Sequence, residues 1–154
     1  MKGNIQVMAQ LSKLLSEELT AINQYMVHAE MCANLGYSKL AAINKGNAIS
    51  EMRHSEKLIE RAIFLEGVPI VDHYGEIKIG ARVDQQLNND LKLELGAVAS
   101  YNVAITVADL AKDAGTRELL EGILVEEEGH LHVYEQQLDQ ISQMGLENYL
   151  SVII

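Results

Sequence analysis

Two copies of the motif Glu-x-x-His constrain this chain more than any other feature of its sequence. The copies span residues 51–54 and 127–130, and a lone glutamate precedes each of them by 33 residues. A single shift of 76 residues superposes all six side chains, which are Glu18, Glu51, His54, Glu94, Glu127 and His130. Metal-binding residue types that repeat in register are typical of a two-metal site built from two helical hairpins.

The spacing of these residues also indicates the kind of metal. Residues three apart lie on one face of an α-helix, so each Glu-x-x-His pair can bind one ion through an oxygen and a nitrogen. Glu18 and Glu94 come from other predicted helices, and either can bridge two ions. Mixed carboxylate and imidazole ligands suit iron, manganese or zinc better than calcium or magnesium. Four carboxylates balance the charge of two divalent ions, so we predict a dinuclear centre.

A single Glu-x-x-His on a helix is usually a solvent-facing or chance pair, whereas two in register are hard to explain by chance. The adjacent Glu126 and Glu128 are interpreted as solvent-facing residues. Tyr25 and Tyr101 each lie seven residues beyond an upstream glutamate, on its face of the helix. Either tyrosine can hydrogen-bond a ligand carboxylate, or can instead be an ordinary core or interface residue.

The remaining histidines do not share the phase of the six candidate ligands. His28 points away from Glu18 by helical phase, and His73 falls in a stretch without helical periodicity. His132 lies two residues past His130, on nearly the opposite face of the helix. We expect all three at a surface or an interface.

Apolar spacing predicts an all-α chain with four long helices and a short fifth one. The predicted ranges are about 4–35, 39–66, 84–112, 116–143 and 146–154, with Ser38 and Thr116 as caps of the second and fourth helices. Residues 67–81 lack helical periodicity, and 77–79 alternate like a short extended piece. Fully extended, such a segment reaches about 50 Å, so it can cross the bundle and leave the second and third helices parallel. Residues 1–154 are expected to form one domain, with the apolar tail packed on other subunits.

Composition narrows the partners and the compartment. The net charge is −10, which argues against nucleic-acid binding and suits cations. Cys32 is the only cysteine, so no disulfide framework or cysteine metal site is expected. No signal segment or apolar run of about 18 residues is recognised, and we expect a cytoplasmic protein without membrane association.

Several motifs give the chain a specific resemblance to the bacterioferritin family over nearly its whole length. They are LSEELTAINQY, EMRHSEKLIERAIFLEG, LELG, EEEGH and MGLENYL. The resemblance implies a ferritin-like bundle in a shell of twenty-four identical subunits. Such a shell oxidises Fe(II) with O₂ or H₂O₂ and stores ferric mineral. It also implies that the six residues above are the ferroxidase ligands, with Glu51 and Glu127 as the bridges, and that a ferredoxin-type reductase serves iron release.

The resemblance gives Met52 a role that its spacing alone does not. By helical spacing alone, Met52 lies about 100° around the helix from Glu51, so it is interpreted as an interface methionine. In the family this methionine and its twin from a neighbouring subunit are the axial ligands of a b-type haem at a twofold interface. The chain departs from some family members at Gly46, Ser50, Leu58 and Val133, which puts an inner-surface iron site and an aromatic electron route in doubt.

Two other classes of function fit parts of the pattern. One is a dimanganese catalase or another dinuclear iron or manganese oxidase on the same bundle. The other is a DNA-protecting mini-ferritin or an inert helical bundle. The absence of a basic tail disfavours DNA binding, and the apolar tail favours the larger shell.

Overall fold

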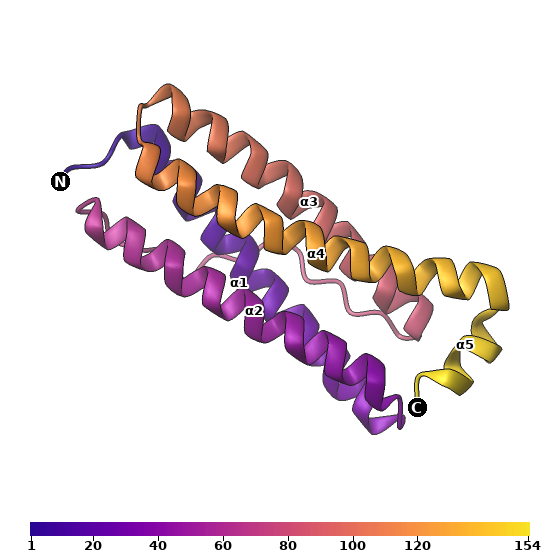
Figure 1. The fold of residues 1–154 in the computed structure, drawn as a ribbon. Helices are drawn as coiled ribbons and strands as arrows, with labels where there is room; N and C mark the ends of the chain where they lie inside the picture. Colours follow the sequence, from indigo (N-terminus) through magenta and orange to yellow (C-terminus); the bar gives the residue numbers. More distant parts are fainter.

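The computed structural model describes residues 1–154 and contains five α-helices and no strand. The helices are α1 (Ile5–Asn34), α2 (Ser38–Phe64), α3 (Val83–Leu110), α4 (Ala114–Met144) and α5 (Leu146–Val152). The first four form one bundle, and α5 turns back across its end (Figure 1). The predicted all-α four-helix bundle with a long crossover and a short fifth helix is confirmed.

Two antiparallel hairpins build the bundle, one from α1 and α2 and the other from α3 and α4 (Figure 1). The crossover between α2 and α3 runs the length of the bundle, so α3 is parallel to α2 as predicted. Residues 77–79, predicted as a short extended piece, belong to no helix and pair with no strand.

Three polar side chains of α1, spaced four residues apart, hold the crossover against the bundle. Each is buried and accepts a hydrogen bond from a backbone N–H of the crossover. The bonds run from Gly75 to Thr20 Oγ1 (2.8 Å), from Lys78 to Gln24 Oε1 (2.8 Å) and from Gly80 to His28 Nε2 (3.0 Å). A segment without secondary structure therefore has its backbone donors satisfied by one face of α1.

The expectation that His28 lies at a surface or an interface is wrong, because the side chain is completely buried. Its Nδ1 lies 2.8 and 2.9 Å from the two carboxylate oxygens of Asp90 on α3. Since Nε2 accepts from Gly80, the ring proton is on Nδ1 and is donated to Asp90. Helical phase placed His28 away from the glutamates correctly, but that direction leads to α3 and the crossover. His73 and His132 are exposed, as predicted.

The hydrophobic core consists of two clusters at different levels of the bundle. One includes Leu11 and Leu14 with residues of the other three long helices, and the second includes Tyr25, Leu87 and Tyr134. On each long helix the candidate metal ligands lie in sequence between the residues of the two clusters. The polar centre is therefore a layer across the middle of the bundle with an apolar core on either side.

The helix starts differ from the predicted caps at two places. Tyr37, not Ser38, precedes α2, and the free N–H of Lys39 donates to the carbonyl of Ile153 at 3.1 Å. The N-cap of α4 is Asp113, which accepts the N–H of Thr116 at 3.0 Å, so α4 begins two residues before Thr116. The predicted hydroxyl caps are thus replaced by the distant carbonyl of Ile153 at the start of α2 and by the carboxylate of Asp113 at the start of α4.

The C-terminal tail packs partly on its own chain. Tyr149 and Ile153 are buried in the second cluster, whereas Val152 and Ile154 are exposed. The expectation that the tail needs another subunit therefore applies only to the exposed part of it.

One helix, α3, has the length and composition of a membrane span, but it forms one wall of the bundle and contains the buried acids Asp90 and Glu94.

We predict that His28→Ala loosens the crossover. The substitution removes the acceptor of the Gly80 N–H, and a hydrogen bond of about 1 kcal/mol corresponds to about fivefold in the opening equilibrium. Hydrogen–deuterium exchange of the peptides covering residues 75–82 should accelerate by at least that factor. His73→Ala, an exposed histidine of the same segment, is the control. Unchanged protection in His28→Ala would contradict the role given to the α1 side chains.

Candidate metal centre

The four long helices bring all six predicted ligands together at the middle of the bundle. Five of them are buried, and only His130 retains slight exposure, 14% of its side chain. Their ligand atoms form two overlapping groups, each within 4.8 Å. The first group is Glu18, Glu51, His54 and Glu127, and the second is Glu51, Glu94, Glu127 and His130.

Two residues belong to both groups. Glu51 and Glu127 are shared, whereas Glu18 and Glu94 each belong to one group only. The open possibility that Glu18 or Glu94 bridges two ions is therefore not supported by the geometry. Helix phase alone could not separate these roles, because it does not say how closely the four helices approach one another.

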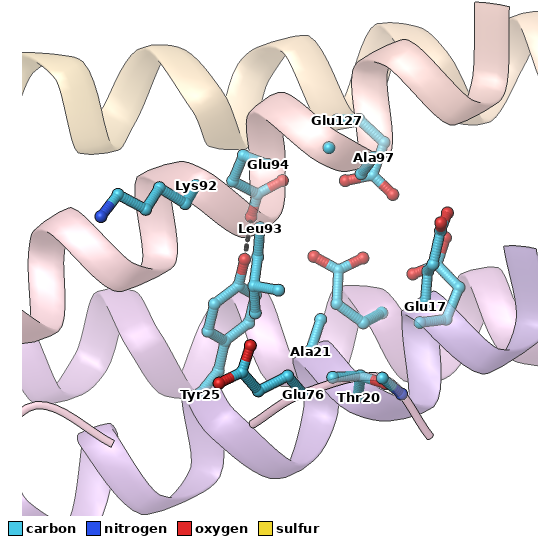
Figure 2. A pocket seen from close by; sticks show the side chains of 14 residues that line it. Glu17, Thr20, Ala21, Tyr25, Glu76, Lys92, Leu93, Glu94, Ala97 and Glu127 are labelled. Carbon is cyan, nitrogen blue, oxygen red and sulfur yellow. Dashed lines mark hydrogen bonds between the residues drawn. The ribbon is translucent and has the colours of Figure 1, made fainter. Parts of the chain in front are cut away.

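Contacts across the centre are reciprocal under the 76-residue shift. The Nδ1 of His54 lies 3.1 Å from Glu127, and the Nδ1 of His130 lies 2.9 Å from Glu51. The tyrosines behave in the same way, since each of the two hairpins donates a hydroxyl to the other. Tyr25 donates to Glu94 at 2.5 Å (Figure 2), and Tyr101 donates to Glu18. The two hairpins thus face each other about a pseudo-twofold axis.

Several buried polar atoms at the centre have no hydrogen-bond partner. They are both carboxylate oxygens of Glu51, Oε2 of Glu127 and Nδ1 of His130. The close contacts of Glu51 to the imidazole nitrogens therefore lack hydrogen-bond geometry. Buried polar atoms are normally paired, and unpaired ligand atoms that converge from α2 and α4 fit divalent ions. The donor set of four carboxylates and two imidazoles is the composition found in dinuclear iron and manganese carboxylate proteins.

The electrostatics of the centre show its need for positive charge. Burial raises the pKa of Glu18 and Glu94 well above the usual value, and the neighbouring carboxylates add to the effect at both. Burial alone would lower the pKa of His54, but its three carboxylate neighbours outweigh burial and raise it to about 12. In the same way Glu127 and Glu51 raise the pKa of His130 to about 10. Divalent ions must compete with protons for this site.

A pocket of about 140 Å³ opens from the centre to the surface between α1 and α3. Glu17, Glu76 and Lys92 line it outside the buried ligands (Figure 2). Glu76 belongs to the crossover, beside Gly75, which is bonded to Thr20. Thr20, one of the α1 residues that hold the crossover, therefore also positions one wall of the pocket. Its volume admits small species such as water, O₂ or a metal ion.

One contact near the centre was not predicted from the sequence. Glu126 is exposed, as predicted, but its Oε2 also lies 3.1 Å from Nε2 of His54. Its other oxygen accepts a bond of 2.9 Å from Lys57 on α2. The run of three glutamates concealed this contact, since only the distance between α2 and α4 shows which of them reaches the histidine.

Comparison with known proteins agrees with this geometry. Residues 8–144 match the family of the ferritin-like domain. A bacterioferritin of Brucella melitensis is 38% identical over 149 residues, which cover 97% of this chain and 92% of that protein. The bacterioferritin of Streptomyces coelicolor is 35% identical, and the match covers 100% of this chain and 92% of that protein. The bacterioferritin of Mycobacterium tuberculosis is 34% identical, and the match covers 97% of this chain and 94% of that protein. The chain belongs to the bacterioferritin family.

Met52 and the positions that differ from some bacterioferritins lie in distinct surroundings. Met52 is half exposed on the outer surface of α2, outside the bundle core as its phase predicted. Leu58 is buried in the first apolar cluster and contributes to its packing. Gly46 and Ser50 present neither an imidazole nor a carboxylate, and Val133 is not aromatic.

We predict that metal binding at the centre releases protons. A pH of 7 lies below the pKa of His54, about 12, and that of His130, about 10, so both imidazoles are protonated and positively charged. An imidazole that binds a metal ion must be neutral. Loading with Zn(II) should therefore release at least about two protons per chain. Calorimetry in buffers of different ionisation enthalpy measures this number.

Two variants make the measurement specific. His54→Ala should reduce the proton release by about one, and His132→Ala, which changes an exposed histidine outside the centre, should leave it unchanged. Zn(II) binding without proton release would show that the histidines are already neutral or do not bind the metal.

Proposed function

We propose that this chain is an iron-storage protein and a ferroxidase whose dinuclear centre oxidises Fe(II). The observation that supports the proposal most strongly is the pair of overlapping ligand groups that share Glu51 and Glu127. Two Fe(II) ions, as substrate, would occupy the groups, with Glu18 and His54 completing one and Glu94 and His130 the other. The relatives are named bacterioferritins, which supports iron as the metal.

The reaction follows from two ions held side by side. Each Fe(II) gives one electron to O₂, which takes up two protons and leaves as H₂O₂; with H₂O₂ as oxidant, two electrons and two protons give two waters. The shared carboxylates of Glu51 and Glu127 hold the ions close enough to act together. The unpaired carboxylate oxygens at the centre would also bind the more highly charged Fe(III).

The chain's own residues also serve the reaction outside the ligand set. Tyr25 and Tyr101 donate hydrogen bonds to Glu94 and Glu18 and so orient the terminal carboxylates. The pocket lined by Glu17 and Glu76 connects the centre to the surface and gives Fe(II) and the oxidant a short path. A negative lining attracts cations, and the net charge of −10 adds to this attraction in an assembly.

We predict that Glu51→Ala and His130→Ala lose the rapid phase of Fe(II)-dependent O₂ consumption. Both remove a ligand, and loss of even an outer partner of a metal ligand costs about 10–100-fold in affinity or activity. An oxygen electrode and the absorbance of the ferric product measure the two sides of the reaction. Glu128→Ala, an exposed residue of the same helix, is the matched control. Wild-type rates in both ligand variants would exclude the proposed centre.

Assembly and storage complete the proposal. A shell of twenty-four subunits would enclose the ferric mineral, in the cytoplasm, with a ferredoxin-type reductase supplying electrons for iron release. The exposed apolar residues of the tail, Val152 and Ile154, support contact with further subunits. A dimanganese catalase remains the second candidate for the same ligands, and metal analysis of the protein purified from its own cell separates the two. The net charge of −10 disfavours the DNA-protecting alternative.

A b-type haem at a subunit twofold interface is the second cofactor that we propose. The half-exposed thioether of Met52 fits an axial ligand, since it leaves the bundle on the outer side of α2 and has no packing role in the core. A bound haem would supply one-electron transfer for iron reduction. Met52→Leu should abolish the Soret band of haem-reconstituted protein while leaving ferroxidase activity intact. Met26→Leu, an exposed methionine of α1, is the control, and a Soret band retained in Met52→Leu would contradict the assignment.

A further inference from the structure

The two histidines of the metal centre have matching surroundings except at one contact. Every ligand that faces His54 has a partner that faces His130 when the chain is shifted by 76 residues. The exception is the contact of 3.1 Å between Glu126 and the second ring nitrogen, Nε2, of His54. The shift places Ser50 where a counterpart of Glu126 would stand, and no side chain hydrogen-bonds Nε2 of His130.

Glu126 is itself held in position. The Nζ of Lys57 donates to its second oxygen at 2.9 Å, so one carboxylate links α2 and α4 through two residues of α2. The carboxylate of Glu126 is therefore held against the imidazole of His54 by a second contact.

A carboxylate acceptor on Nε2 determines how His54 presents its other nitrogen. Nε2 keeps its proton for Glu126, so Nδ1, which faces Glu18, Glu51 and Glu127, is the nitrogen that would give up its proton and bind the ion. Such an acceptor also makes the imidazole a stronger ligand and fixes the orientation of the ring. His130 lacks this support and retains slight exposure, so its ring is less constrained.

We propose that Glu126 is a positioning residue that makes the two metal positions unequal. The position of Glu18 and His54 binds its ion first and more tightly, and the position of Glu94 and His130 holds the more exchangeable ion. This inference rests on the dinuclear centre proposed above and adds an order of loading to it. The two shared bridges, Glu51 and Glu127, do not create the difference, because they belong to both positions.

Anaerobic titration with Co(II) tests the inference without relying on ferroxidase activity. Co(II) bound by oxygen and nitrogen ligands has visible d–d bands, and calorimetry on the same samples gives the two stepwise affinities. The wild-type protein should bind two Co(II) per chain, the first more tightly than the second. Glu126→Ala should weaken the first step by about tenfold, the low end of the range for such partners because Glu126 is half exposed. In this variant the affinities of the two Co(II)-binding steps should become more nearly equal.

Three further variants separate positioning from a general structural effect. Glu128→Ala, in the adjacent exposed residue, should leave both steps unchanged. Glu126→Gln keeps an oxygen that can accept from Nε2 and should recover part of the loss, which a purely structural role for the contact does not predict. Ser50→Glu supplies the missing counterpart beside His130 and should strengthen the second step.

The outcomes that overturn the inference are distinct from those that overturn the proposed function. Two equal steps in the wild type, or a first step unchanged in Glu126→Ala, contradict the role of Glu126 while leaving the dinuclear centre intact. Fewer than two Co(II) per wild-type chain overturns the dinuclear centre and the inference with it.

Discussion

Four glutamate carboxylates buried in the middle of a helical bundle require positive charge beside them. A buried carboxylate without a partner is so costly that it takes up a proton instead, and burial raises the pKa of Glu18 and Glu94 for this reason. His54 and His130 respond in the opposite sense, since the surrounding carboxylates hold protons on them. Two divalent metal ions would neutralise the buried carboxylates in place of these protons. The chemistry of the centre and the stability of the bundle therefore depend on one electrostatic balance.

The rest of the fold keeps this layer in place. An apolar cluster on each side supplies the hydrophobic stabilisation that the polar layer does not. The crossover is hydrogen-bonded to Thr20, Gln24 and His28, so the backbone on either side of Glu76 in the wall of the pocket is held against α1. The buried pair of His28 and Asp90 is a second polar site, but it serves the connection between α1, α3 and the crossover. Rigid support around a few unpaired ligand atoms is the arrangement that a metal site requires.

Much of this architecture could be predicted from the sequence because its main signals are periodic. The helix ranges and the grouping of the six ligands follow from spacing, and the structure confirms that these residues meet. Contacts between helices were harder to predict: the burial of His28, the tail carbonyl that caps α2, and the reach of Glu126 to His54. Each depends on distances between segments far apart in the chain, which no local pattern contains. Spacing did not identify Glu51 and Glu127 as the shared residues either; that expectation came from the family resemblance, and so does the proposed haem at Met52.

The central claim is that two metal ions lie side by side between Glu51 and Glu127. Crystals soaked anaerobically with Fe(II) and measured on both sides of the iron absorption edge test it most directly, because anomalous scattering locates iron independently of activity. Two anomalous peaks per chain are predicted, one near Glu18 and His54 and the other near Glu94 and His130. A single peak, or peaks confined to Glu17 and Glu76 at the mouth of the pocket, would contradict the account.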